Sequence, residues 1–98
     1  SYAPQVQRLV AAVPAHTTCL TTWAMDTADI GALRWHTPWQ VHALRVLPQG
    51  TPSCSWLLTT PQAWADVSQE HTQNCLPSAT IVRPTQRHDH WLLLRQRP

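Results

Sequence analysis

The sequence predicts an α/β domain: a mainly parallel sheet with flanking helices and a C-terminal antiparallel hairpin. Helical and strand-like segments alternate in the order α-β-α-β-β-α-β-β, which is typical of sheets covered by helices. Two apolar runs, residues 19–24 and 54–59, each begin with a cysteine and precede a helical segment. Two further strand-like segments end the chain. The 98 residues are enough for one such domain.

The first predicted helix covers residues 3–13. Pro4 lies in its first turn, where a missing N–H has no consequence, and Pro14 ends it. The spacing of the apolar residues places them on one helix face. They are Val6, Leu9, Val10 and Val13.

A strand, a short helix and a second strand are predicted next. Residues 17–24 are rich in threonine with a central leucine and tryptophan, which favours a strand. Asp26 or Thr27 caps the helix, which ends at Thr37 before a proline. Residues 41–46 have β-branched ends and precede a cluster of turn residues, so we predict a strand there.

The continuous apolar run at residues 54–59 is typical of a strand buried on both faces. Thr60 followed by Pro61 predicts the start of a helix. The Thr60 hydroxyl would cap the helix, and Pro61 would occupy its first position. This helix is predicted to end near Glu70. Residues 71–78 are predicted to be a polar loop that contains Cys75.

The predicted terminal hairpin pairs residues 79–83 with residues 90–95. A turn over residues 84–89 connects the two strands.

The composition limits the classes of partner that this chain is expected to have. The chain has no lysine, no phenylalanine and six tryptophans, and only 12% of its residues are charged. A formal charge of +2 does not indicate a nucleic-acid partner. The low charged fraction is unfavourable for the solubility of a free-standing protein and is easier to reconcile with a domain that lies against another surface. The sequence contains no apolar stretch long enough to span a membrane. We expect residues 1–98 to be a single soluble domain, cut from a longer polypeptide.

The three cysteines leave three alternatives open. We favour a Cys19–Cys54 disulfide, because both residues begin strands that would lie side by side in a parallel sheet. The rival pairing is Cys54–Cys75, and the third alternative is three reduced, buried thiols. The favoured pair would place the chain in an oxidising compartment and stabilise it by roughly 4 kcal/mol in a chain-entropy treatment.

The sequence predicts no metal site, no cofactor and no catalytic residue. His88, Asp89 and His90 resemble a metal-binding fragment, but they fall in a predicted turn, where polar residues are common. No cysteine or histidine spacing is that of a zinc site. The other histidines are scattered without pattern: His16, His36, His42 and His71. No nucleophile elbow, phosphate-binding loop or carboxylate pair is present.

Tryptophans supply the candidate binding residues. Trp35 and Trp39, together with Arg34, would form a stacking surface for a sugar ring, a base or a lipid headgroup. The alternative is that Trp35 is partly buried at a helix end. Four other tryptophans are expected to replace phenylalanine in the core: Trp23, Trp56, Trp64 and Trp91. The arginines of the final hairpin would face anionic headgroups or form an ordinary solvated surface: Arg83, Arg87, Arg95 and Arg97.

The overall pattern resembles the soluble C-terminal domain of bacterial ArnT-like, protein-mannosyltransferase-related membrane glycosyltransferases. The resemblance covers most of the chain through short motifs. They are Ser1-Tyr2-Ala3-Pro4-Gln5-Val6, Ala11-Ala12-Val13-Pro14, Thr18-Cys19-Leu20, Ala32-Leu33-Arg34-Trp35-His36, Cys54-Ser55-Trp56-Leu57-Leu58 and Trp91-Leu92-Leu93-Leu94-Arg95.

The resemblance implies an accessory domain at the periplasmic face of the bacterial inner membrane. In that family the membrane helices move a sugar from a polyprenyl-phosphate carrier to lipid A, another glycolipid or a protein. Their loops hold the catalytic acids, so no catalytic role transfers to this chain. The implied partners are the membrane portion of the same polypeptide and a lipid or glycan acceptor. The alternatives are a stand-alone periplasmic or secreted module that binds carbohydrate or protein, and a cytosolic interaction domain with reduced thiols.

Overall fold

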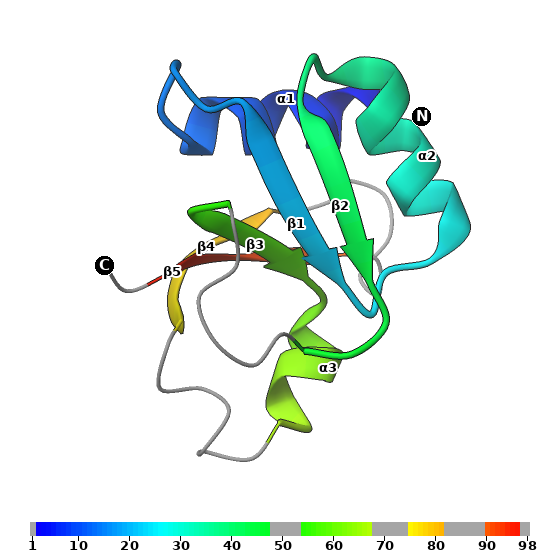
Figure 1. The fold of residues 1–98 in the computed structure, drawn as a ribbon, viewed down its shortest axis with the longest axis vertical. Coiled ribbons are helices and arrows are strands. Elements are labelled where there is room, and N and C mark those ends of the chain that lie inside the picture. Colours follow the sequence, from blue (N-terminus) through cyan, green and yellow to red (C-terminus); the bar gives the residue numbers. More distant parts are fainter. Residues whose placement is uncertain (1, 48–53, 68–74, 82–89, 97–98) are drawn as a thin grey trace.

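Figure 1 shows a computed structural model that describes residues 2–47, 54–67, 75–81 and 90–96. The predicted turn after residue 46 and the predicted turn over residues 84–89 lie outside the described residues. The elements form a small α/β domain. They are α1 (Ala3–Ala12), β1 (Cys19–Trp23), α2 (Thr27–His36), β2 (Gln40–Leu44), β3 (Trp56–Thr59), α3 (Pro61–Ala65), β4 (Cys75–Ile81) and β5 (Trp91–Gln96).

The strands form a mixed sheet in the order β2-β1-β3-β5-β4. β1 pairs in parallel with β2 on one side and with β3 on the other. β5 pairs antiparallel with both β3 and β4. Half of these strand pairs are therefore antiparallel, and the prediction of a mainly parallel sheet is wrong.

The position of β5 explains the error. We expected the last strand to belong to a hairpin that finishes a parallel sheet, but β5 lies in the interior, between β3 and β4. Leu93 and Leu94 are both fully buried, on opposite faces of the sheet. Consecutive buried leucines require cover on both faces of the sheet, and the core beneath α1 and α2 covers one while the core beside α3 covers the other.

The larger core lies between the sheet and the two longer helices, which occupy the top of the view in Figure 1. Val6 and Leu9 of α1 and Leu33 of α2 are almost completely buried against the sheet. The residues below them come from all five strands of the sheet: Leu20, Val41, Leu58, Ile81, Trp91 and Leu93. Val10 was expected on this buried face, but it is 44% exposed.

The opposite face of the sheet has a smaller core beside α3. Leu57, Leu94 and Cys75 are its buried members, and Trp64 of α3 packs on them. Figure 1 shows α3 on the side of the sheet away from α1 and α2. The sheet therefore has a larger core on the face covered by α1 and α2 and a smaller core on the face covered by α3.

The caps of α2 follow from the sequence. The Asp26 side chain accepts a hydrogen bond from the Asp29 N–H at 2.8 Å, so Asp26 is the N-cap. At the other end the Thr37 hydroxyl donates to the Leu33 carbonyl at 2.7 Å. Thr37 is extended, as expected for the residue before a proline.

The second half of the chain departs from two predicted boundaries. α3 starts at Pro61 behind the Thr60 cap, as predicted, but ends at Ala65 rather than near Glu70. β4 begins at Cys75, so the prediction of a loop through residue 78 is wrong. The polar character of residues 71–78 favours a loop, and Pro77 within β4 lacks an N–H for strand pairing. An edge strand tolerates that loss, and the pairing of β4 is irregular at this residue.

Candidate functional site

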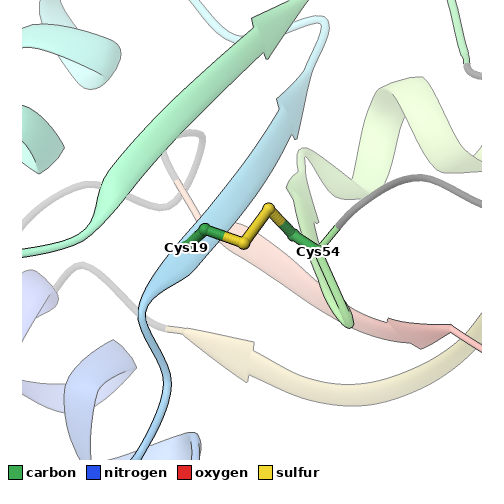
Figure 2. Close-up of a disulfide and its surroundings, with 2 residues drawn as sticks. All are labelled: Cys19 and Cys54. Atoms are coloured by element: carbon green, nitrogen blue, oxygen red, sulfur yellow. A yellow bond between two sulfur atoms is a disulfide. The ribbon is translucent and has the colours of Figure 1, made fainter.

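A disulfide joins Cys19 to Cys54 at one end of the sheet (Figure 2). Cys19 is the first residue of β1, and Cys54 lies just before β3. Their Cα atoms are 5.7 Å apart, within the usual range for a disulfide. The parallel pairing of Thr21 with Leu57 brings the two chain segments together. The favoured cysteine pairing is thus confirmed.

The rival pairing fails because β5 separates the two cysteines. Cys75 pairs with Gln96 of β5, and the Gln96 N–H donates to the Ser55 carbonyl beside Cys54. Two strand spacings of about 4.8 Å therefore lie between Cys75 and the chain at Cys54, beyond disulfide reach. Cys75 is a free, buried thiol, and its burial raises its pKa. The raised pKa keeps Cys75 protonated and unreactive at neutral pH.

His42 is the third member of the cluster at the disulfide. A ring nitrogen of His42 and the sulfur atoms of Cys19 and Cys54 all lie within 4.8 Å of one another. β2 pairs with β1 so that His42 is opposite Thr21, the residue that shares a sheet face with Cys19. Sequence reasoning missed His42 because only the β1–β2 register, which the sequence does not reveal, brings it to the cysteines.

A shallow cavity of about 170 Å³ opens beside the disulfide. Its walls come from the start of β1, the segment before it and the start of β3: His16, Thr17, Thr18, Cys19, Ser55 and Trp56. The Arg95 guanidinium lies 6.0 Å from the centre of the Trp56 ring, its cross-strand neighbour. Such a contact is a cation–π interaction. Hydroxyl groups, an imidazole and an indole thus meet at this end of the sheet.

The predicted binding residues do not form one surface. Trp39 is only 8% exposed and belongs to the core beneath α1 and α2. Trp35 is 84% exposed, so the alternative in which it is partly buried is wrong. An Arg34 guanidinium nitrogen donates to the Val41 carbonyl of edge strand β2 at 3.1 Å. Arg34 therefore has a structural contact, and Trp35 alone retains the exposure that a stacking residue needs.

The four tryptophans predicted for the core differ in burial, and most of the predicted metal-like fragment lies outside the described residues. Trp91 is fully buried, as predicted, and stacks on Tyr2 at a ring separation of 6.3 Å. Trp23, Trp56 and Trp64 are only partly buried at the margins of the two cores. His88 and Asp89 lie outside the described residues, as do Arg83, Arg87 and Arg97.

A second cavity, of about 320 Å³, lies between α1 and the end of α2. Val6, Gln7 and Val10 form its α1 side, and His36 lies on its α2 side. The half-exposed Val10 gives this cavity an apolar rim. Trp35 precedes His36 in the chain, so this end of α2 contributes both cavity lining and an exposed aromatic ring.

No protein-family model matches this chain, and comparison with curated proteins and with solved structures gives no significant match. Within the described residues, no helix has the length and apolar character needed to cross a bilayer.

Proposed function

We propose that this chain is an accessory domain, at the periplasmic face of the inner membrane, of a membrane glycosyltransferase. The whole enzyme would move a sugar from a polyprenyl-phosphate carrier to lipid A, another glycolipid or a protein. The domain would have no catalytic activity alone. It would orient the acceptor or stabilise the membrane portion of the same polypeptide.

The Cys19–Cys54 disulfide is the observation that carries this proposal. Disulfides persist in oxidising compartments and are rare where thioredoxin and glutathione keep thiols reduced. The bond links two neighbouring strands of the main sheet, so it is part of the fold rather than a surface attachment. A periplasmic location agrees with this, and the resemblance of the short motifs to those of the glycosyltransferase domain supports the proposed enzyme class.

The surface at the end of α2 supports an accessory role. Trp35 is 84% exposed, and indole rings favour interfaces in which one side is apolar and the other is wet. The exposed Val10 and the cavity beside His36 add apolar surface to the neighbouring part of α1. Such a surface fits a domain that rests on another part of its own polypeptide or on a lipid surface.

Activity of the full-length enzyme tests the proposal. Sugar transfer from a polyprenyl-phosphate donor would be measured for the intact polypeptide, for one that lacks this domain and for the domain alone. We expect the domain alone to be inactive and its removal to lower transfer by the membrane portion. Undiminished transfer without the domain, or an upstream reading frame that encodes no membrane helices, would refute the proposal.

The state of the cysteines tests the compartment separately. Cells that produce the protein from its own gene would be quenched in acid, and free thiols would then be alkylated under denaturing conditions. We expect one alkylated cysteine, Cys75, and an intact Cys19–Cys54 bond. Three alkylated cysteines would exclude the periplasmic location.

The exposure of Trp35 favours a second candidate, a stand-alone module that binds carbohydrate. A sugar ring stacked on Trp35 would change the indole fluorescence, and the Trp35→Ala variant would lose that change. Trp39 has no part in this candidate because its ring is buried. Titration with oligosaccharides separates the two functions, since the accessory domain does not require binding of a free sugar.

A further inference from the structure

We propose that reduction of the Cys19–Cys54 disulfide converts this end of the sheet into a zinc site. Its ligands are the thiolates of Cys19 and Cys54 and the imidazole of His42. Two thiolates and one imidazole are a ligand set that suits Zn²⁺, with the fourth position left to water. This inference is independent of the proposed function.

The distances suit zinc once the sulfur–sulfur bond is open. Zinc–sulfur bonds of about 2.3 Å and zinc–nitrogen bonds of about 2.0 Å in a tetrahedron separate two sulfurs by about 3.8 Å and sulfur from nitrogen by about 3.5 Å. The three ligand atoms already lie within 4.8 Å of one another. Small side-chain rotations are therefore enough, with the Cα atoms of the cysteines left 5.7 Å apart.

The backbone holds all three ligands without the disulfide. His42 lies within β2, and its partner Thr21 lies within β1, the strand that Cys19 begins. Thr21 also pairs with Leu57 of β3, which fixes the strand that follows Cys54. The Thr59 hydroxyl adds a hydrogen bond of 2.7 Å to the Trp23 carbonyl at the far end of the same two strands. These contacts place the ligands before metal binds, which lowers the entropic cost of closing the site.

The chemistry balances with a dithiol as the reductant. The dithiol transfers two electrons and two protons to the disulfide, which becomes two thiols, while the dithiol becomes a disulfide. Zn²⁺ then replaces one proton on each cysteine, so binding releases two protons. His42 binds through a neutral ring nitrogen. In the oxidised chain both sulfurs are held in the covalent bond, so the site exists in one redox state only.

Cys75 cannot replace either cysteine, because β5 lies between it and Cys54. The metal and the disulfide are thus alternative links between the same two chain segments. Zinc would maintain the connection of β1 to the start of β3 under reducing conditions.

Cobalt spectroscopy tests the site directly. The full chain would be prepared in two states, oxidised and reduced with a phosphine. Each would be titrated with Co²⁺, and Zn²⁺ would then be added. We expect the reduced chain to bind one Co²⁺, with thiolate-to-cobalt charge-transfer bands that Zn²⁺ abolishes. The oxidised chain should show no such bands. A reduced chain without these bands would overturn the proposal.

Two histidine variants establish whether His42 is a ligand. We expect His42→Ala to weaken cobalt binding at least tenfold, since loss of a mere outer partner of a zinc ligand costs about 10- to 100-fold. His36→Ala is the matched control, because His36 lies at the end of α2 beside the other cavity, and should bind as the parent chain does. Near-ultraviolet circular dichroism of the oxidised variants checks their folding.

Equal affinities for the parent and His42→Ala would overturn the assignment of His42, as would equal losses in both variants. His42→Cys gives a second measurement. It should restore binding with a stronger charge-transfer band from a third thiolate, and failure to do so would also count against the site.

Discussion

Trp35 and Trp39 are close in sequence but have opposite environments. Trp35 belongs to the last turn of α2 and projects its ring into solvent, with 84% of the residue exposed. Trp39 follows the helix, and its ring is enclosed by the core beneath α1 and α2. The backbone N–H of Trp39 also donates a hydrogen bond to the Thr37 hydroxyl at 3.3 Å, which fixes the chain as it leaves the helix. Pro38 between them ends the helix and changes the direction in which the next ring points.

Alanine variants of these two tryptophans should differ widely in stability. We expect Trp39→Ala to lower the free energy of unfolding by about 3–5 kcal/mol, because removal of a buried indole leaves a cavity. Trp35→Ala should change it by no more than about 0.5 kcal/mol, as at most exposed positions. Urea unfolding followed by circular dichroism measures both values. Similar losses in the two variants would contradict the assigned environments.

At the scale of the element, α2 depends on its ends as much as on its single fully buried side chain, Leu33. Asp26 satisfies the Asp29 N–H at the start, and Thr37 contacts the Leu33 carbonyl at the end. Arg34 then links the helix to edge strand β2 through the Val41 carbonyl. That contact also covers an acceptor that a second chain could otherwise pair with.

Removal of the α2 cap should be measurable. We expect Asp26→Ala to lower the free energy of unfolding by about 1 kcal/mol, within the range of about 0.5–2 kcal/mol found for N-caps. Asp66→Ala is the matched control, since Asp66 lies at the C-terminal end of α3, where a carboxylate is not favoured by the helix dipole. Thermal unfolding of both variants gives the comparison. An equal loss in the control would mean that the cap contributes nothing specific.

At the scale of the whole molecule, the disulfide joins two residues that are 35 positions apart in sequence. The loop that it closes contains α2 and β2. Closure of a loop this long restricts the unfolded chain, and within the described residues α3 is the one helix on the thinner face of the sheet. A small domain with two cores of unequal size gains from such a restriction.

Loss of the disulfide should therefore cost the domain about 4 kcal/mol of unfolding free energy in the chain-entropy treatment. Guanidinium unfolding of the parent chain, with and without reductant and with a metal chelator present, gives this difference. The Cys19→Ala/Cys54→Ala variant should unfold like the reduced parent and ignore the reductant. A parent chain insensitive to reductant would contradict the role given to this bond.

Local signals predicted much of the fold. Pro4 and Pro14 bracket α1, Asp26 caps α2, and Thr60 with Pro61 starts α3. These features depend on neighbours in sequence, so one chain segment is enough to reveal them. The start of β4 at Cys75 escaped prediction because Pro77 and Ser78 favour loops, and only the position of β4 at the sheet edge makes them acceptable.

The candidate site was only partly predictable. The Cys19–Cys54 pair followed from two similar apolar runs, each of which begins with a cysteine. The approach of His42 depends on the register of β1 with β2, and the exclusion of Cys75 depends on β5 lying between the strands. Both are set by pairing between distant segments, which no local pattern records.

Local sequence patterns predict the helices and most of the strands, and they favour the Cys19–Cys54 pairing, because backbone preferences and apolar runs act over a few residues. Tertiary structure alone decided that half of the strand pairs are antiparallel, that Trp39 is buried while Trp35 is not, and that His42 joins the cysteines. Those outcomes depend on how the whole chain buries Leu93 and Leu94 on opposite faces at once. Only a complete arrangement of strands satisfies that requirement.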